Sequence, residues 1–393
     1  MARVVDFYAL RRRGDMIKWR RVRTMSSSLK EVLASHTMEA AAALVRREGV
    51  DSVRCVACGH RCLIREGKSG ICKVRFNRQG MLRVPGGYVA GLQIDPIEKK
   101  PFFHAYPGRE TLSFGMLGCD FHCGYCQNWV TSQSLRDDRA VALPRICEAD
   151  ELVDLARENN VPVVVSTYNE PLITSEWAVR VFEKAREHGL ACGFVSNGNA
   201  TPEALAFIKP YVSLYKVDLK GFNDRHYRSL GGVLSNILDA IVRIKSMGFW
   251  LELVTLVVPG FNDDAQELKA MARFIASVSP EIPWHITAFH PDYKMATPPR
   301  TTLHELDRAY EAGKEAGLHY VYPGNLPRQV GERENTNCAA CGELVIRRRG
   351  FTVVENCMRG TACRACGHEI PGVWEQVPPM ASVGTGYPRA LRI

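Results

Sequence analysis

The chain has 393 residues, of which 46% are hydrophobic, and this length can bury a barrel-sized core with small appended segments. No apolar run is long enough to span a bilayer, and the basic N-terminus lacks the apolar region of a secretory signal, so we expect a cytoplasmic protein without a membrane span. The formal net charge of +9 is concentrated in residues 1–30, which carry nine basic and two acidic side chains. Such an arm can bind nucleic acid or an anionic surface. A solvated tail, or a start codon assigned upstream of Met16 or Met25, explains it more simply, and we expect no nucleic-acid partner.

The predicted elements begin with an Ala-rich helix at 29–48, which contains no Gly or Pro. A cysteine-rich segment at 55–72 and a loop-like stretch at 85–108, with Pro and Gly at intervals, follow it. Strands then alternate with helices. The predicted strands are 111–117, 161–167, 191–196, 212–220, 249–259, 284–289 and 318–325, and the predicted helices are 148–160, 174–188, 202–209, 233–247, 264–278 and 302–316. This alternation predicts parallel βαβ units and a partial or full (β/α) barrel.

Polar residues stand directly after most of these strands. They are Asn169 and Glu170, Ser196 and Asn197, Asp218 and Lys220, Asn262 and Asp263, and His290 and Asp292. In parallel α/β folds the carboxyl ends of the strands form the functional site, so we expect these side chains to converge on one mouth. A single residue of this kind is more simply a turn or cap residue, whereas a recurring set is harder to explain in that way.

The fourteen cysteines of a large chain without a signal indicate metal sites rather than disulfides. Near the C-terminus, Cys338, Cys341, Cys363 and Cys366 form two C-x2-C pairs with zinc-ribbon spacing. This pattern predicts a structural tetrathiolate site and does not distinguish zinc from iron, while Cys357 remains outside the set. Two isolated cysteines, Cys147 and Cys192, are predicted to be small buried hydrophobic residues.

A second group, Cys55, Cys58, Cys62 and Cys72, has a less standard spacing but also supplies four thiolates. Zinc and an auxiliary iron–sulfur cluster are both compatible with it, and we favour a structural role. His60 lies within this group and can replace one cysteine, although an exposed loop histidine is the simpler interpretation.

The central motif, "GCDFHCGYCQNW" at 118–129, offers three thiolates with the spacing C-x3-C-x2-C: Cys119, Cys123 and Cys126. Short cysteine spacings suit iron–sulfur clusters, and three thiolates on a four-iron cluster leave one iron open to an external ligand. The alternative is a zinc site completed by His122 or by a distant cysteine, but His122 is crowded between two of the ligands.

This motif resembles that of the radical S-adenosylmethionine (SAM) superfamily. Together with "DPIEKKPFFHAYPG", "YNEP", "SNG", "VDLKGF", "LVVPGFND", "FHPDYKM" and "YVYPGN", it resembles the AmmeMemoRadiSam system radical SAM enzymes, which are relatives of the pyruvate formate-lyase activating enzyme. The resemblance extends from Cys55 to Cys366. It implies a partial (β/α)6 radical SAM barrel, which we place at 110–328. Residues 1–50, a basic arm and helix, lie outside the resemblance. We expect a cysteine-rich segment at 51–109 and a zinc-ribbon or rubredoxin-like domain and tail at 329–393.

The resemblance also implies roles for individual residues. Cys119, Cys123 and Cys126 would hold a [4Fe–4S] cluster, whose fourth iron SAM would chelate. The implied SAM contacts are Tyr125 on the adenine side, Asn169 and Glu170 toward the amino group, Ser196 and Asn197 on the third strand, Lys220 toward the carboxylate, Asp218 toward a possible monovalent cation, and His290 near the mouth. One departure is notable, because Tyr168 and Asn169 replace two glycines of the superfamily motif.

The implied reaction is reductive cleavage of SAM, with an electron from a flavodoxin or ferredoxin type of donor, to give a 5′-deoxyadenosyl radical that abstracts hydrogen from a substrate. His104, Asp292, Tyr293, Lys294 and the stretch 95–101 are expected near the mouth. The substrate is not readable from the sequence. A small-molecule enzyme is our first hypothesis, a glycyl-radical activase acting on a partner protein the second, and a non-enzymatic nucleic-acid binder the weakest. AmmeMemo-family proteins are a further possible partner.

Overall fold

The computed structural model describes residues 29–374 and 386–391, so the basic arm at 1–28 lies outside the described residues. Its centre is a nine-stranded sheet with the order β16-β15-β14-β13-β12-β11-β9-β8-β22. The seven parallel strands are β9 (Glu110–Gly115), β11 (Val163–Ser166), β12 (Ala191–Ser196), β13 (Leu214–Asp218), β14 (Trp250–Val257), β15 (Trp284–Ala288) and β16 (Val321–Gly324). At one edge β8 (Gly91–Pro96) pairs antiparallel with β9, and β22 (Arg389–Ala390) pairs antiparallel with β8. Since β16 and β22 are not paired with each other, the barrel is open.

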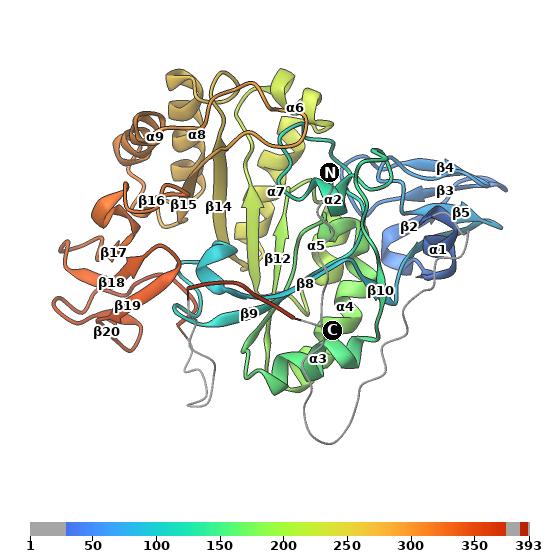
Figure 1. Ribbon diagram of the computed structural model, residues 1–393, viewed down its shortest axis with the longest axis horizontal. Coiled ribbons are helices and arrows are strands. Elements are labelled where there is room, and N and C mark those ends of the chain that lie inside the picture. The colour runs from blue at the N-terminus through green and yellow to red at the C-terminus, as the bar shows by residue number, and fades with distance from the viewer. Residues whose placement is uncertain (1–28, 375–385, 392–393) are drawn as a thin grey trace.

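Helices connect the parallel strands and cover the outer face of the sheet (Figure 1). They are α2 (Trp129–Ser132), α3 (Ala149–Glu158), α4 (Ser175–Glu187), α5 (Pro202–Ile208), α6 (Asp224–Leu230), α7 (Leu234–Ser246), α8 (Ala265–Val278) and α9 (Leu303–Glu315). Six of the strands each lead through a helical connection to the next strand, which confirms the prediction of a partial (β/α)6 barrel. Every predicted barrel helix is present, whereas the short helices α2 and α6 were not predicted. No helix within the described ranges is long and apolar enough to cross a membrane.

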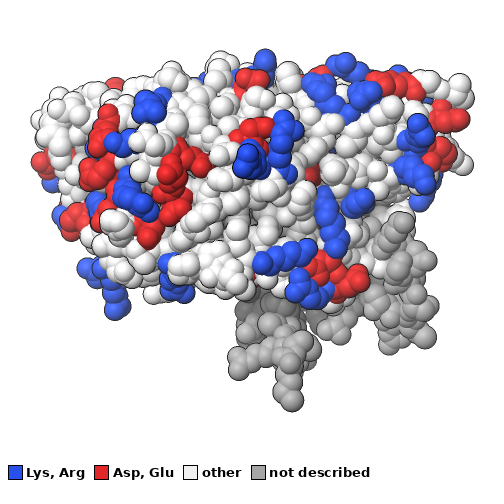
Figure 2. Space-filling view, turned by 90° about the horizontal axis from the view of Figure 1, so that it is seen from above, with Lys and Arg blue, Asp and Glu red and all other residues white. Residues whose placement is uncertain are grey.

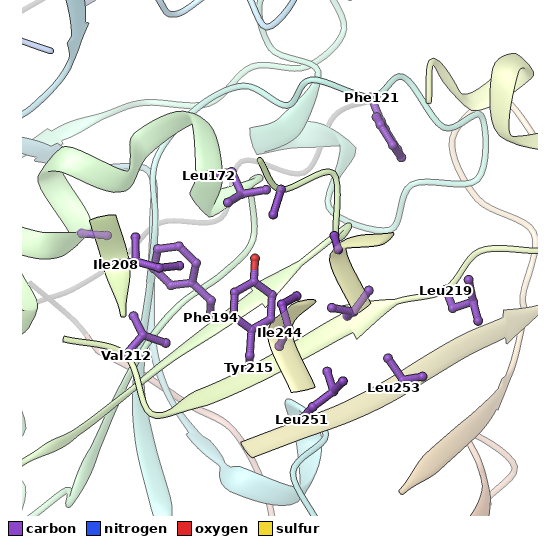
Figure 3. Close-up of a cluster of buried hydrophobic side chains, with 14 of the residues drawn as sticks. Phe121, Leu172, Phe194, Ile208, Val212, Tyr215, Leu219, Ile244, Leu251 and Leu253 are labelled. Carbon is purple, nitrogen blue, oxygen red and sulfur yellow. The ribbon is translucent and has the colours of Figure 1, made fainter. Parts of the chain in front are cut away.

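Strand residues alternate between the two faces of the sheet. Phe194 and Tyr215 point to the helix side, where Figure 3 shows them among Ile208, Ile244 and Leu251. These side chains are fully buried or nearly so. The intervening strand residues therefore face the inner side of the barrel, and this alternation decides which side chains can meet a bound ligand.

The two flanking segments lie at opposite sides of the barrel (Figure 1). The N-terminal segment contains α1 (Leu29–Ser35), β1 (Thr37–Glu39), η1 (Ala42–Leu44), β2 (Val45–Arg47), β3 (Ser52–Cys55), β4 (Leu63–Arg65), β5 (Phe76–Arg78), β6 (Met81–Pro85) and β7 (Tyr88–Val89), of which β7 pairs with β10 (Arg145–Ile146). The C-terminal segment contains η4 (Gly331–Glu334), β17 (Thr336–Asn337), β18 (Leu344–Arg349), β19 (Thr352–Asn356), β20 (Met358–Arg359) and β21 (Ala362–Cys363). Figure 2 shows Lys and Arg side chains interspersed with Asp and Glu on the face viewed from above.

The predicted helix at 29–48 is wrong beyond Ser35. Thr37–Glu39 pairs with β6 and Val45–Arg47 pairs with β3, so strand ladders take the backbone groups that a helix would have used. The helix preference of alanine is a fraction of a kcal/mol per residue, which tertiary pairing overrides.

The loop-like interpretation of 85–108 is also wrong, because this stretch contains β8 and the 3-10 turn η2 (Ile97–Lys99). All six residues of β8 pair with β9, from Gly91 opposite Gly115 to Pro96 opposite Glu110. Proline is tolerated here because it ends the strand. The inner face of the barrel therefore begins before residue 110.

Candidate active site

The three central cysteines lie on one loop that leaves β9 at the carboxyl edge of the sheet and leads into α2. Cys123 is buried, and Cys119 and Cys126 are half-buried. The backbone N–H of Phe121 donates to Cys119 Sγ at 3.3 Å, and the Ser132 hydroxyl lies 3.2 Å from Cys126 Sγ. Donors aimed at sulfur suit thiolates that bind a metal cluster.

Burial raises the pKa of Cys123 to about 12 and also raises that of Cys119. As free thiols these groups keep their protons, so binding of a metal cluster would release them. The loop thus offers soft donors, hydrogen bonds to sulfur and three ligands from a single segment, which fits an iron–sulfur cluster with one open position.

Glu170 lies in a socket of donors next to this loop. Its Oε1 accepts from Ser196 Oγ at 2.7 Å and from the Leu172 N–H at 3.1 Å, and its Oε2 accepts from the Asn197 N–H at 2.7 Å. Burial, followed by the charge of Asp120, raises the pKa of Glu170 to about 8. A buried carboxylate with a raised pKa gains most from a cationic ligand, such as an ammonium group.

Asn169 bonds to backbone groups of Met116 and Glu170. Its Oδ1 accepts from the Met116 N–H at 2.9 Å, and its Nδ2 donates to the carbonyl oxygen of Glu170 at 3.1 Å. These bonds join the ends of β9 and β11 and fix the position of Glu170.

Sequence reasoning missed Asp120, which lies in the cysteine loop, and Asn199, which lies next to it. Asp120 is fully buried beside Cys119, and its two oxygens accept from Asn197 Nδ2 at 2.7 Å and Asn199 Nδ2 at 2.9 Å. The position of Asp120 between Cys119 and Cys123 in the sequence could have identified it as a site residue. The Asp120 carboxylate thereby ties the cysteine loop to the loop that follows β12.

Asp218 and Lys220 meet at the end of β13, as the sequence predicted. Lys220 Nζ donates to Asp218 Oδ2 at 3.2 Å, and Lys216, which was not predicted, pairs with Asp218 Oδ1. Burial alone would raise the pKa of Asp218, but the two lysines lower it to about 2. The carboxylate is therefore ionised and flanked by two ammonium groups.

The loop that follows β15 covers the cysteine loop. The N–H of Lys294 donates to the Gly124 carbonyl at 2.9 Å, and the Tyr293 ring stacks on Trp129 with 5.1 Å between centroids. His290 is exposed and lies 3.2 Å from Gln127 Nε2. Tyr125 is buried beside Phe261, with 5.7 Å between ring centroids.

The expectation that His104 lies near the mouth is wrong. His104 is fully buried at the opposite end of the barrel, where Nε2 lies 2.6 Å from the Tyr322 hydroxyl and Nδ1 lies 2.7 Å from the Pro371 carbonyl. Burial lowers its pKa to about 4, so it is neutral near pH 7. The reason is topological: η2 and the segment after it cross under the amino ends of the strands, where His104 contacts Trp250 at the start of β14.

The C-terminal cysteines have the geometry of a mononuclear metal site. The sulfurs of Cys338 and Cys366 are 3.6 Å apart, those of Cys341 and Cys363 are 3.8 Å apart, and all four lie within 4.8 Å of one another. A tetrahedral site with metal–sulfur bonds of about 2.3 Å has edges of about 3.8 Å, so this set fits a single zinc or iron ion.

The N-terminal cysteine group packs against the active-site loops. Cys55, Cys58 and Cys72 are buried, and β3 and β4 bring Cys55 and Cys62 together through a 2.9 Å backbone bond. The Gly59 N–H donates to the Asn199 carbonyl at 2.8 Å. In the part of the chain that the structure describes, only the C-terminal set brings its sulfurs within 4.8 Å, so metal binding by this group stays a prediction. Cys147 and Cys192 are buried among apolar residues, as predicted.

Comparisons with known proteins agree with this geometry. The chain is 36% identical over 325 residues to an uncharacterized protein of Methanocaldococcus jannaschii, a match that covers 81% of this chain and 95% of that protein. The family model of the radical SAM superfamily matches residues 115–275, which include the cysteine loop, Glu170 and Lys220. The chain belongs to the radical SAM superfamily.

This radical SAM enzyme is also 23% identical over 191 residues to the pyruvate formate-lyase-activating enzyme of Staphylococcus aureus, covering 47% of this chain and 76% of that enzyme. Among solved structures, a radical SAM methyltransferase from Sphaerobacter thermophilus is 16% identical, and the alignment covers 80% of this chain and 84% of that one with a TM-score of 0.43. The sequence similarity establishes homology to the activating-enzyme family and indicates a [4Fe–4S] cluster and SAM as cofactors.

Proposed function

We propose that this enzyme cleaves SAM reductively and uses the resulting 5′-deoxyadenosyl radical to abstract hydrogen from a small-molecule substrate. The observation that carries the proposal is the convergence of three unlike features at one edge of the sheet. These are the loop of three thiols, the buried carboxyl of Glu170, and the lysine-flanked Asp218. A cluster bound at the cysteines supplies the low-potential electron for SAM cleavage.

The side chains suit the charged groups of SAM. The Glu170 carboxylate would accept from the amino group, and the Lys220 ammonium would donate to the carboxylate. Tyr125 and Asn197 would lie along the cofactor, and His290 at the rim. A monovalent cation beside Asp218 has less support, because both of its oxygens already accept from lysines.

The second candidate is an activase that forms a glycyl radical on a partner protein, and its support is the similarity to activating enzymes over 47% of the chain. The cysteine segments on both sides of the barrel favour the small-molecule hypothesis instead. We further propose membership of the AmmeMemoRadiSam system, with AmmeMemo-family proteins as partners and a flavodoxin or ferredoxin as cytoplasmic electron donor. The nucleic-acid hypothesis has the least support, since it leaves the residues around Glu170 without a purpose.

For the flanking sites, we propose zinc or one iron ion at Cys338, Cys341, Cys363 and Cys366. The sulfur separations support this assignment, and four thiolates leave no open position for catalysis. A structural metal at the N-terminal cysteine group is the corresponding proposal for Cys55, Cys58, Cys62 and Cys72.

The proposal is tested by reconstituting the protein anaerobically with iron and sulfide and measuring 5′-deoxyadenosine release from SAM under reduction. We expect release from the wild type and from Cys147→Ala, a control that removes a buried cysteine remote from the motif. Joint replacement of Cys119, Cys123 and Cys126 by Ala should abolish release. Persistent release from this triple variant would show that the radical chemistry has been assigned to the wrong residues.

A further inference from the structure

The inner face of the barrel carries a cluster of lysines that is larger than the SAM contacts require. We call it the inner lysine cluster; it comprises Lys99, Lys100, Lys216 and Lys220 with Asp95 and Asp218. Lys216 faces inward because its neighbours Tyr215 and Val217 pack on the helix side. Asp95 faces inward for the same reason, since Ile94 packs on the helix side.

Each aspartate of the cluster is shared by two lysines. Asp95 Oδ1 accepts from Lys99 Nζ at 2.7 Å, while Asp95 Oδ2 pairs with Lys100. Asp218 is shared by Lys216 and Lys220 in the same way. Four ammonium groups thus face two carboxylates, which leaves two positive charges in excess. If the SAM carboxylate neutralises one of them at Lys220, one remains.

The charged groups on the floor of the barrel have partners of their own. Glu252 already accepts from the N–H groups of Phe103 and His104, both at 2.9 Å, from Trp250 at 3.0 Å and from His285 at 2.7 Å. Arg348 lies 3.7 Å from Glu98 and donates to the Phe103 carbonyl at 2.6 Å. Burial lowers the pKa of Lys100 to about 8. The paired Asp95 opposes this shift in pKa, whereas the nearby ammonium groups of Lys99 and Lys216 add to it.

Tyr168 lies across this cluster in a strained conformation. Its φ is +67°, which is unusual for a bulky side chain, and its hydroxyl donates to Asp95 at 2.6 Å. Two glycines make room for it: a Cβ on Gly91 would lie 2.9 Å from the Tyr168 ring, and a Cβ on Gly115 would lie 2.9 Å from the Tyr168 Cβ. The chain therefore preserves a strained aromatic residue directly beside Lys100, whose Nζ is 4.9 Å from the ring centre.

A buried hydroxyl without a partner completes the arrangement. Ser113 is fully buried, and its Oγ has no hydrogen-bond partner among the described residues. It sits opposite Gln93 in the ladder, on the same inner face. Its hydroxyl makes no hydrogen bond of 3.5 Å or less, but it lies near the Tyr168 hydroxyl and lowers the pKa of that group. A buried unpaired hydroxyl is unfavourable unless a ligand satisfies it.

We propose that Lys100 and Ser113, oriented by Asp95 and Tyr168, bind an oxyanion group, carboxylate or phosphate, on the small-molecule substrate of this enzyme. The inference rests on the proposed function, because it assigns the substrate class of the same barrel. An anion at this position would neutralise the remaining positive charge, satisfy Ser113 and receive a charge-assisted hydrogen bond from Lys100. A neutral glycyl loop, the substrate expected for an activase, would neither neutralise this charge nor form a charge-assisted bond with Lys100, and it would leave Ser113 unsatisfied.

The test measures binding of inorganic phosphate and of malonate, each by equilibrium dialysis against the oxidised, SAM-bound holoenzyme at low ionic strength. We expect about one site per chain, weakened by about tenfold or more in Lys100→Met. Binding should be retained in Lys100→Arg and unchanged in Lys184→Met, a surface control whose lysine pairs with Glu187 on α4. Preference for phosphate or for malonate identifies the oxyanion.

A second variant keeps the test valid if Lys100→Met does not fold. Ser113→Ala removes an unpaired hydroxyl, so it should fold normally and weaken binding several-fold. The proposal is overturned if neither probe binds the wild type, or if both bind the Lys100 and Ser113 variants as tightly as the wild type. Release of 5′-deoxyadenosine without substrate should persist in the wild type and in the surface control Lys184→Met; its loss from the wild type would instead contradict the proposed function.

Discussion

The socket around Glu170 makes a quantitative prediction for Glu170→Gln. In this nearly isosteric variant Oε1 can still accept from Ser196 Oγ and the Leu172 N–H, but the new amide NH2 must then face the Asn197 N–H, which loses its 2.7 Å bond. A buried backbone donor without a partner costs about 1–3 kcal/mol of stability, reduced here because the repulsion between Glu170 and Asp120 disappears.

The larger effect is expected on SAM binding. A charged hydrogen bond contributes about 1.5–3 kcal/mol, so loss of the carboxylate should weaken SAM binding by roughly 10- to 150-fold. The measurement is equilibrium dialysis of SAM against the oxidised, reconstituted protein, which binds without turnover. Ser196→Ala is the matched control, because it removes one neutral donor and keeps the charge, and its affinity should fall by less than tenfold.

Two results would refute this reasoning. If folded Glu170→Gln binds SAM within about twofold of the wild type, Glu170 does not contact the amino group. If Ser196→Ala weakens binding as much as Glu170→Gln does, the socket acts through its shape and not through its charge.

Three further predictions concern stability and metal content. Burial raises the pKa of Glu98 from 4.5 to about 7, so its contribution to stability is fully present below pH 4.5 and is lost as the pH rises through 7. In denaturant titrations, the free energy of unfolding of Glu98→Gln should therefore rise relative to that of the wild type by on the order of 3 kcal/mol between pH 4.5 and 8. Arg75→Met should destabilise the protein by about 3–5 kcal/mol, because it leaves the buried Glu176 carboxylate without the guanidinium that donates to its oxygens at 2.7 and 2.8 Å. The double variant with Glu176→Met should lose less stability, and equal losses would contradict the pairing. Cys338→Ser should lose one equivalent of metal by elemental analysis while the central cluster keeps its iron, and Cys357→Ser, outside the set, should lose none.

The sequence predicted the barrel and the position of the cysteine loop after β9 because both follow from local patterns. Alternating apolar strands and helices predict parallel units wherever the chain is long enough, and the spacing of Cys119, Cys123 and Cys126 specifies a soft metal with three ligands. Glu170, Asn197 and Lys220 were predicted from their positions after strands, and the structure brings them to the same edge. The four C-terminal cysteines were predicted in the same manner.

The sequence was least informative where long-range pairing decides the conformation. Residues 29–48 have a helical composition, yet partners at β3 and β6 draw Thr37–Glu39 and Val45–Arg47 into strands. His104 belongs to a motif expected at the mouth, but the path of the chain after β8 places it on the floor of the barrel beside Tyr322.

The sequence by itself predicted the order of strands and helices from local patterns, and the superfamily from the resemblance of its short motifs, since each depends on residues close together in the chain. Only the tertiary structure placed Asp95 against Tyr168, 73 residues later, and Lys216 on the same inner face as Ser113. Charge balance inside a barrel depends on distances between strands that no local pattern encodes. The excess of lysines, and the substrate class we infer from it, therefore emerged only when the strands were brought together.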